Sequence, residues 1–208
     1  LVDDAENDSN IQFFIGKSFI ENKNGFPKNT QLGFKYLKRS MKEGNIEAFY
    51  ENAELLRKGS YQQENQNNNN NMNDYDEEMI NLYKEASDKG NSKAIFQYAV
   101  IKSDKQLIKK AADKGCVKAM FYYGIELETQ DKIDESIEYF KKAADEGHVE
   151  SMNKYALILL KKFHEKGNIE QQDDIIKYLK KASDRGCIKS MFEYGKILFE
   201  GDAGVTKN

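Results

Sequence analysis

The residues that could carry catalysis or hold a metal are few in this chain. Its 208 residues include two histidines, His148 and His164, and two cysteines, Cys116 and Cys187. A nucleophile or general base needs a positioned partner, and a metal needs several clustered ligands. We expect His148, which follows a turn glycine, to be solvated, and His164 to face water or a helix terminus. The sequence therefore predicts a protein that is not an enzyme and that uses no metal or cofactor.

Five cations are better candidates, because they could bind an anionic group on another protein. Lys110 and Lys114 are four residues apart, and Lys177, Lys181 and Arg185 follow one another at the same interval. Residues four apart share one face of a helix, and like charges placed there reduce its stability. Because such a cost can indicate function, we predict these five as partner-binding residues. The alternative is a solvated basic face without a role.

These cations belong to a unit that recurs along the chain. The stretch IKKAADKGCVKAMFYYG (108–124) has a close copy in LKKASDRGCIKSMFEYG (179–195). Five copies share a small residue, called the anchor below, with glycine four residues after it and further small residues eight and thirteen after it. The anchors are Ser40, Ala86, Ala111, Ala143 and Ala182. A repeated pattern indicates architecture rather than a single catalytic motif.

The columns of the repeat predict a helical hairpin. Apolar residues three and four positions before the anchor have helical spacing. The glycine supplies the left-handed conformation that ends this first helix, and a second helix follows. Small residues on both helices let the two backbones approach closely, and such hairpins bury their apolar faces by stacking. The predicted fold class is all-α, a superhelical solenoid of antiparallel helical hairpins.

We predict a single repeat array over residues 1–208. It begins with a leading half-repeat at 9–29 and continues with hairpins at about 30–58, 75–102, 104–128, 133–164 and 172–201. The Asn-rich insert at 60–76 is polar and lacks periodicity, so it is expected to be disordered. Residues 16–29 match residues 195–208, and we therefore expect the chain to be a fragment of a longer solenoid.

Two further columns have structural explanations. In four copies a lysine two residues before the anchor has an aspartate four residues after it, and such pairs stabilise a helix by about 0.2–0.5 kcal/mol each. They are Lys84–Asp88, Lys109–Asp113, Lys141–Asp145 and Lys180–Asp184. Tyrosines of the second helix are expected in the core between repeats, with each hydroxyl bonded to a partner or to water. They are Tyr98, Tyr123, Tyr155 and Tyr194.

The pattern A-A-D-x-G-x-x-x-[AS]-M-F-x-Y-G and the connector G-V-x-K-N resemble the Sel-1-like repeat family, which is related to tetratricopeptide arrays. The resemblance covers residues 9–208 apart from the Asn-rich insert. It implies a right-handed α-solenoid that acts as an adaptor or scaffold in multiprotein assemblies. In tetratricopeptide-like stacks the first helix lines the concave side, so the five cations would project into a groove. There they would meet acidic or phosphorylated segments of partner proteins.

Composition limits the partners and the compartment. The net charge is −3, and Glu138 and Glu146 interrupt the cations, which argues against a nucleic-acid track. No apolar run approaches the roughly 20 residues that span a bilayer. Two cysteines form no disulfide framework, which favours a reducing compartment such as the cytoplasm. The predicted function is a non-catalytic scaffold for protein–protein interactions, and the alternative is a permanent structural subunit of a large assembly.

Overall fold

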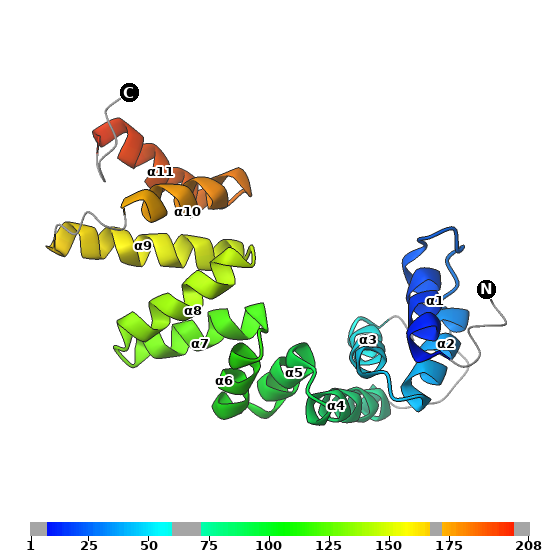
Figure 1. Cartoon of the computed structure of the whole chain (residues 1–208). Coiled ribbons are helices and arrows are strands. Elements are labelled where there is room, and N and C mark those ends of the chain that lie inside the picture. The colour runs from blue at the N-terminus through cyan, green and yellow to red at the C-terminus, as the bar shows by residue number, and fades with distance from the viewer. Residues whose placement is uncertain (1–7, 60–71, 167–171, 202–208) are drawn as a thin grey trace. The chain divides into compact units, whose positions relative to one another are not determined.

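The computed structural model describes residues 8–59, 72–166 and 172–201, and the regular structure within these ranges is α-helical (Figure 1). The chain divides into two compact units, Leu1–Leu107 and Ile108–Asn208. The first unit contains α1 (Ser9–Glu21), α2 (Thr30–Lys42), α3 (Ile46–Arg57), α4 (Met72–Asp88) and α5 (Ser92–Lys102). The second contains α7 (Val117–Thr129), α8 (Ile133–Asp145), α9 (Val149–Lys166), α10 (Gln172–Asp184) and α11 (Ile188–Glu200). Helix α6 (Lys105–Asp113) spans the division.

The turn inside each hairpin is formed by the repeated glycine and the residue after it. All five turn glycines have φ between 86° and 96°, in the left-handed region, which confirms that they end the first helices; they are Gly44, Gly90, Gly115, Gly147 and Gly186. Where the next residue is asparagine, its side chain caps the second helix. Asn45 Oδ1 accepts a hydrogen bond from the Ala48 amide at 3.1 Å, and Asn91 Oδ1 accepts one from the Ala94 amide at 2.9 Å. These bonds satisfy amides that a helix start otherwise leaves without a partner.

Small residues set the distance between the second helix of one hairpin and the first helix of the next. A Cβ atom on Gly16 of α1 would lie 2.9 Å from the Gly33 carbonyl oxygen of α2. In the second unit, a Cβ atom on Gly124 of α7 would lie 2.7 Å from the Phe140 ring of α8. The absence of a side chain at Gly124 therefore leaves the space that the Phe140 ring occupies.

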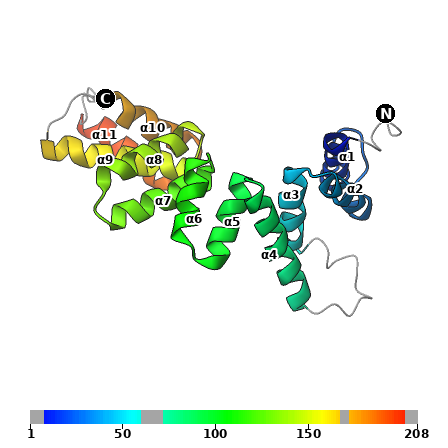
Figure 2. The same cartoon turned by 60° about the horizontal axis from the view of Figure 1, so that its bottom comes forward.

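The core of the second unit is continuous from α8 to α11. Each of these helices packs on the next one along the chain, as Figures 1 and 2 show for the segment coloured yellow-green to red. The largest fully buried side chains of this cluster are Phe140, Met152, Tyr155, Leu159, Ile175, Tyr178, Leu179 and Ile197. Burial of such side chains contributes about 1.5–3 kcal/mol each, so stacking of hairpins holds the unit together.

Two segments are less regular than the rest. Helix α6 is the shortest of the described helices, and its buried residues are Ala111 and Ala112, which bury little apolar surface. Helix α4 begins at Met72, so residues 72–76 of the Asn-rich insert expected at 60–76 are helical. Residues 60–71 of that insert lie outside the described residues.

Candidate partner-binding surface

The five predicted cations all lie in the second unit, and all five are exposed. Lys110 is in the last turn of α6, and Lys114 is in the turn that follows it. Lys177 and Lys181 are one turn apart on α10, and Arg185 lies in the turn between α10 and α11. The structure thus places them as two groups on first helices and on the turns that end those helices.

The two lysines of α10 flank one tyrosine. Lys177 Nζ lies 4.8 Å from the centroid of the Tyr178 ring, and Lys181 Nζ lies 5.8 Å from it. Lys177 Nζ also lies 3.8 Å from Asp174 Oδ1. Cation–π contacts at exposed sites stabilise by about 0.5–1 kcal/mol, so these lysines have a structural role besides any role in binding.

Arg185 supports a neighbouring turn. Its Nη1 donates a hydrogen bond to the Gly147 carbonyl oxygen at 2.8 Å, which links the α10–α11 turn to the turn between α8 and α9. The guanidinium is therefore directed to a backbone acceptor. Arg185 therefore has a structural role besides any role in binding.

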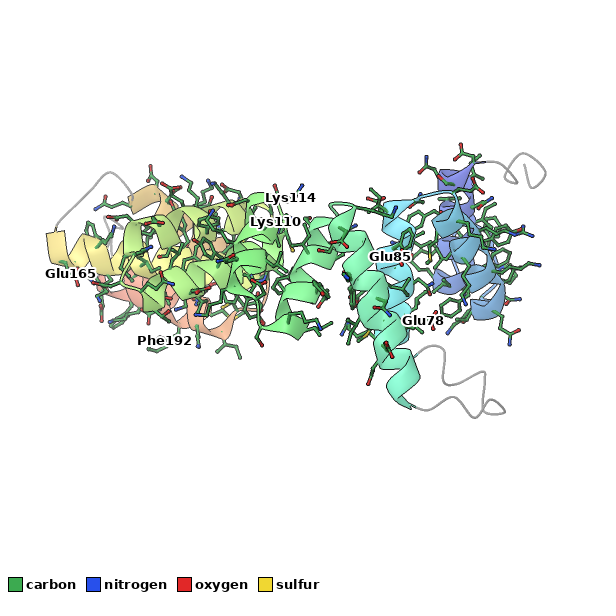
Figure 3. All side chains as sticks on the ribbon, turned by 90° about the horizontal axis from the view of Figure 1, so that it is seen from below. Glu78, Glu85, Lys110, Lys114, Glu165 and Phe192 are labelled. Carbon is green, nitrogen blue, oxygen red and sulfur yellow. The ribbon has the colours of Figure 1, made fainter. Side chains whose placement is uncertain are left out.

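Lys110 and Lys114 differ from the α10 group. Among the described residues, neither ammonium group forms a hydrogen bond, an ion pair or a contact with an aromatic ring. In the view of Figure 3 both lysines are labelled in the upper part of the second unit, and Phe192 of α11 is labelled at its lower edge. These two lysines are the cations for which the fold supplies no structural reason.

Tyrosines of the first helices link consecutive hairpins in the second unit. Tyr139 of α8 donates its hydroxyl to Asp113 Oδ1 at 2.7 Å, and Tyr178 of α10 donates its hydroxyl to Asp145 Oδ1. Burial raises the pKa of both tyrosines, and the bonded carboxylates raise it further. The phenols therefore remain neutral donors, and each turn aspartate binds the next hairpin.

The predicted ladder of lysine–aspartate pairs is only partly present. Lys109 Nζ donates to Asp113 Oδ2 at 2.7 Å, as expected. Lys141 instead donates to Asp174 Oδ2 of α10 at 3.4 Å. The predicted Lys141–Asp145 pair is therefore wrong, because stacking brings a carboxylate of the next hairpin within reach of Lys141.

The four tyrosines of the second helices do not all lie in the core, contrary to the prediction from the sequence. Tyr155 confirms the prediction, because it is buried and its hydroxyl donates to Asp174 Oδ2 at 2.8 Å. Tyr98, Tyr123 and Tyr194 are only half-buried. This tyrosine position is therefore fully buried in α9 and only partly buried in α5, α7 and α11.

His148 is not the solvated turn residue expected from its position. The Ser151 amide donates to His148 Nδ1 at 3.3 Å, so the histidine caps α9, and its ring centroid lies 4.9 Å from that of Phe121. Burial lowers the pKa of His148, and Lys118 lowers it further, while Glu150 opposes the change. Nδ1 must be unprotonated to accept this hydrogen bond. The side-chain oxygens of asparagines are the acceptors at the starts of α3 and α5.

The His148 cap should make stability depend on pH. Because the pKa is lower in the folded chain than in the unfolded one, protonation favours unfolding. The contribution is present above the ordinary pKa of 6.5 and is lost as the pH falls through the lowered pKa. His148→Asn should flatten this part of the profile in melting temperatures measured between about pH 8 and 5. His164→Asn, at an exposed position on α9, should keep the wild-type profile. An unchanged profile in His148→Asn would contradict the assignment.

A buried carboxylate in the first unit was not apparent from the sequence. Glu54 of α3 accepts hydrogen bonds from Arg57 Nη2 at 2.7 Å, Tyr83 Oη of α4 at 2.7 Å and Gln97 Nε2 of α5 at 3.1 Å. Burial acts to raise the pKa of Glu54, but the bonds from Arg57 and Tyr83 outweigh it, so the pKa is lowered. The carboxylate is surrounded by its donors, and it joins three helices.

Within the ranges that the structure describes, there is no group of three or more His, Cys, Asp or Glu side chains placed to hold a metal ion. Cys116 is buried and Cys187 half-buried, both as thiols. None of the helices in these ranges is both long enough and apolar enough to cross a membrane.

Comparisons with known proteins support the same architecture. In the solved structures, a Sel1 repeat protein from Oxalobacter formigenes is similar with a TM-score of 0.73 and 18% identity, over 99% of this chain and 84% of that one. A protective antigen of uropathogenic Escherichia coli with an SLR fold gives 0.57 and 15% identity, over 97% and 51%. An immunity protein from Pseudomonas aeruginosa gives 0.58 and 13% identity, over 91% and 70%. A search of curated proteins gives no match.

These likenesses show the fold, and the predicted all-α solenoid is confirmed. The model of the family described as Sel1 repeat matches residues 12–45, 117–148, 149–187 and 188–208, which together make up more than half of the chain. Proteins with these repeats are generally scaffolds for protein interactions, and the fold is typically non-catalytic. The match extends through both hairpins that carry the α8 and α10 contacts described above. The chain belongs to the Sel1 repeat family.

Proposed function

We propose that this chain is a non-catalytic scaffold that binds a partner protein through cations on its first helices. The partner-binding residues are Lys110, Lys114, Lys177, Lys181 and Arg185, and the first helices present them on one side of the array, toward a groove. The observation that carries the proposal is that Lys110 and Lys114 are exposed and one turn apart, and that their ammonium groups have no bonded partner among the described residues. Like charges in this arrangement cost stability, and binding an anion would offset that cost.

The chemistry of the partner follows from the charge pattern. Lysine ammonium groups bind carboxylates and phosphates, so the proposed ligand is an acidic or phosphorylated segment of a protein. In α8 and the turn after it, Glu138 and Glu146 are exposed where a continuous track would need cations. The two groups of cations therefore support two separate contacts, and they do not favour a nucleic-acid backbone with its regular charge spacing.

The proposal is tested by charge reversal against a defined probe. The probe is a fluorescein-labelled peptide of alternating glutamate and phosphoserine, with a glutamine and serine peptide as the uncharged control. We expect Lys110→Glu with Lys114→Glu to raise the dissociation constant of the acidic probe by at least about tenfold and to reduce its salt dependence. Lys177→Glu with Lys181→Glu should act in the same direction. Arg185 is left unchanged because it supports the Gly147 turn.

A matched variant controls for net charge. Lys35 and Lys42 of α2 are exposed and lie in the first unit, so Lys35→Glu with Lys42→Glu changes the net charge by the same amount. This variant should bind the acidic probe almost as the wild type does. Equal affinity and equal salt dependence in all three double variants would leave the cations as a solvated face and overturn the proposal.

A permanent structural subunit is the second candidate, and exposed apolar side chains on α11 favour it. Exposed apolar patches of this kind mark surfaces that a partner covers. Sedimentation of the purified chain separates the two functions. A scaffold that binds its partner through charges should be monomeric by itself, whereas an obligate subunit should associate or precipitate.

A further inference from the structure

The two groups of cations in the second unit occupy equivalent positions of their repeats. Lys110 of α6 and Lys181 of α10 each directly precede the anchor of their helix. Lys114 and Arg185 each lie three residues after it, and Lys177 lies one helical turn before Lys181. Because equivalent positions of stacked repeats face the same side of the stack, both groups are presented to the same ligand.

Two equivalent hydrogen bonds show that the step from α6 to α8 resembles the step from α8 to α10. Tyr139 of α8 donates to Asp113 at the end of α6, and Tyr178 of α10 donates to Asp145 at the end of α8. Packed helices lie about 8–10 Å apart, so two such steps separate the cation groups by roughly 20 Å. An extended peptide rises about 3.3 Å per residue, so it covers this distance in about six residues.

The cations of α10 bring two positive charges to one aromatic ring. The ammonium groups of Lys177 and Lys181 lie 4.8 Å and 5.8 Å from the centroid of the Tyr178 ring. The carboxylate nearest to Lys177, that of Asp174, also accepts a hydrogen bond from Lys141 at 3.4 Å, so its charge is shared between two lysines. Helix α10 therefore keeps a local excess of positive charge, which an anion would neutralise.

Two ammonium groups one turn apart fit a doubly charged anion. This arrangement occurs twice, in Lys110 with Lys114, called the α6 pair below, and in Lys177 with Lys181, called the α10 pair. A phosphate monoester carries a charge of about −1.5 to −2 at pH 7, whereas a carboxylate carries a single charge. Its three oxygens can accept from both lysines of a pair. A phosphorylated residue therefore matches each pair better than a glutamate or an aspartate does.

Helix α8 and the turn that ends it, between the two pairs, carry the opposite charge. Glu138 and Glu146 are exposed, and neither forms an ion pair with another described residue. Lys142 lies between them in sequence, and its ammonium group is 5.2 Å from the centroid of the Tyr139 ring. A nucleic acid or an anionic membrane would meet these two carboxylates with further negative charge, whereas a peptide can place a cation there.

We propose that the second unit binds a protein segment in which two phosphorylated residues stand about six positions apart, with a basic residue midway between them. One phosphate binds the α6 pair and the other binds the α10 pair, while the basic side chain faces Glu138 and Glu146. The inference rests on the proposed function, which assigns these cations to a partner protein. It adds the number, the spacing and the order of the charges that the partner must carry.

The test measures binding of fluorescein-labelled peptides to the whole chain. The parent peptide carries two phosphoserines about six residues apart and one arginine midway between them. A rearranged peptide of the same composition and net charge carries the two phosphoserines side by side. We expect the parent to bind at least about tenfold more tightly, because a ligand that reaches both pairs gains from effective concentration. Glutamate in place of both phosphoserines should also weaken binding by at least about tenfold.

Neutral substitutions locate the two phosphate contacts. Lys110→Gln with Lys114→Gln should remove the advantage of the parent over the rearranged peptide, and the same changes in the α10 pair should also remove it. Lys35→Gln with Lys42→Gln, at exposed positions of α2 in the first unit, should preserve it. Circular dichroism checks that each variant retains its helices.

A double-mutant cycle locates the central cation. A peptide with glutamine in place of arginine should bind the wild-type chain more weakly than the parent does. Glu138→Gln with Glu146→Gln should remove this difference, because the arginine then meets no carboxylate on α8.

The possible failures are distinguishable. The proposal is overturned if the parent and the rearranged peptide bind equally, or if the arginine makes no difference to the wild-type chain. If both peptides nevertheless lose affinity for the lysine variants, the proposed basic surface stands and only the order of charges is wrong. If no substitution changes the binding of any peptide, the proposed function fails as well. Binding of phosphatidylserine vesicles or single-stranded DNA, with the parent peptide inert, would also overturn the proposal.

Discussion

Glu54→Ala should destabilise the first unit by about 3 kcal/mol. The substitution removes the acceptor of hydrogen bonds from three side chains, Arg57, Tyr83 and Gln97, and leaves the buried Tyr83 hydroxyl without this partner. An unsatisfied buried donor costs about 1–3 kcal/mol, and the loss of contact between three helices adds to it. Urea unfolding followed by circular dichroism measures the change. Glu47→Ala, at an exposed position on the same helix, should remain within about 0.5 kcal/mol of wild type.

The Glu54 carboxylate should also produce an acid-dependent loss of stability. Its pKa is lowered in the folded chain, so its contribution is present above the ordinary value of 4.5 and is lost as the pH falls through the lowered pKa. Glu54→Gln keeps an acceptor for Tyr83 and cannot be protonated in this range. Its unfolding free energy should therefore vary less between about pH 6 and 3 than that of wild type. If both chains lose stability equally, Glu54 is not the titrating group.

Gly124→Leu should destabilise the second unit by about 3 kcal/mol. The new Cβ atom alone would lie 2.7 Å from the Phe140 ring, which is fully buried. The helices α7 and α8 would have to separate, which would also strain the bond between Tyr139 and Asp113. Thermal or urea unfolding measures the effect, and a lower melting temperature with preserved helicity is the expected result.

Gly195→Leu is the matched control, because Gly195 occupies the same repeat position in the same unit. A Cβ atom there meets nothing, so the substitution should be neutral or stabilising by up to about 1 kcal/mol through helix propensity. Equal destabilisation by the two substitutions would show that the hole at Gly124 is not what the glycine provides. Equal tolerance would show that Phe140 can move aside.

The fold could be predicted well because the residues that the turns and the close helix contacts require recur at fixed positions of the repeat. A turn glycine is needed at each left-handed φ, and small residues are needed where helices approach, so both leave columns at fixed spacing. The order of apolar residues then defines which face of each helix is buried. The length of α4 was less accessible, because its first turn, from Met72, lies in a polar segment without helical periodicity.

The polar contacts were predicted less well, because they depend on which side chains stacking brings together. Lys141 and Asp145 have the spacing of an ion pair on one helix, yet Lys141 finds Asp174 of the next hairpin. Glu54 occupies a position that holds no acidic residue in the other copies, where Val100, Ile125, Leu157 and Lys196 stand. The position of His148 after a turn glycine predicts a solvated side chain, but Phe121 of the preceding helix packs against its ring. The five cations were placed on exposed surface, but Arg185 also serves the Gly147 turn, which no spacing within α10 could indicate.

The bonds from Tyr139 to Asp113 and from Tyr178 to Asp145 join neighbouring hairpins rather than parts of one hairpin. In a linear array, the stability of each repeat and the coupling between neighbours are separate quantities. A change of tyrosine to phenylalanine at either position lowers the coupling and leaves the intrinsic stability of each hairpin nearly intact. The unit would then lose cooperativity before it loses helix, and its unfolding would spread over a wider range of denaturant as single hairpins melt on their own.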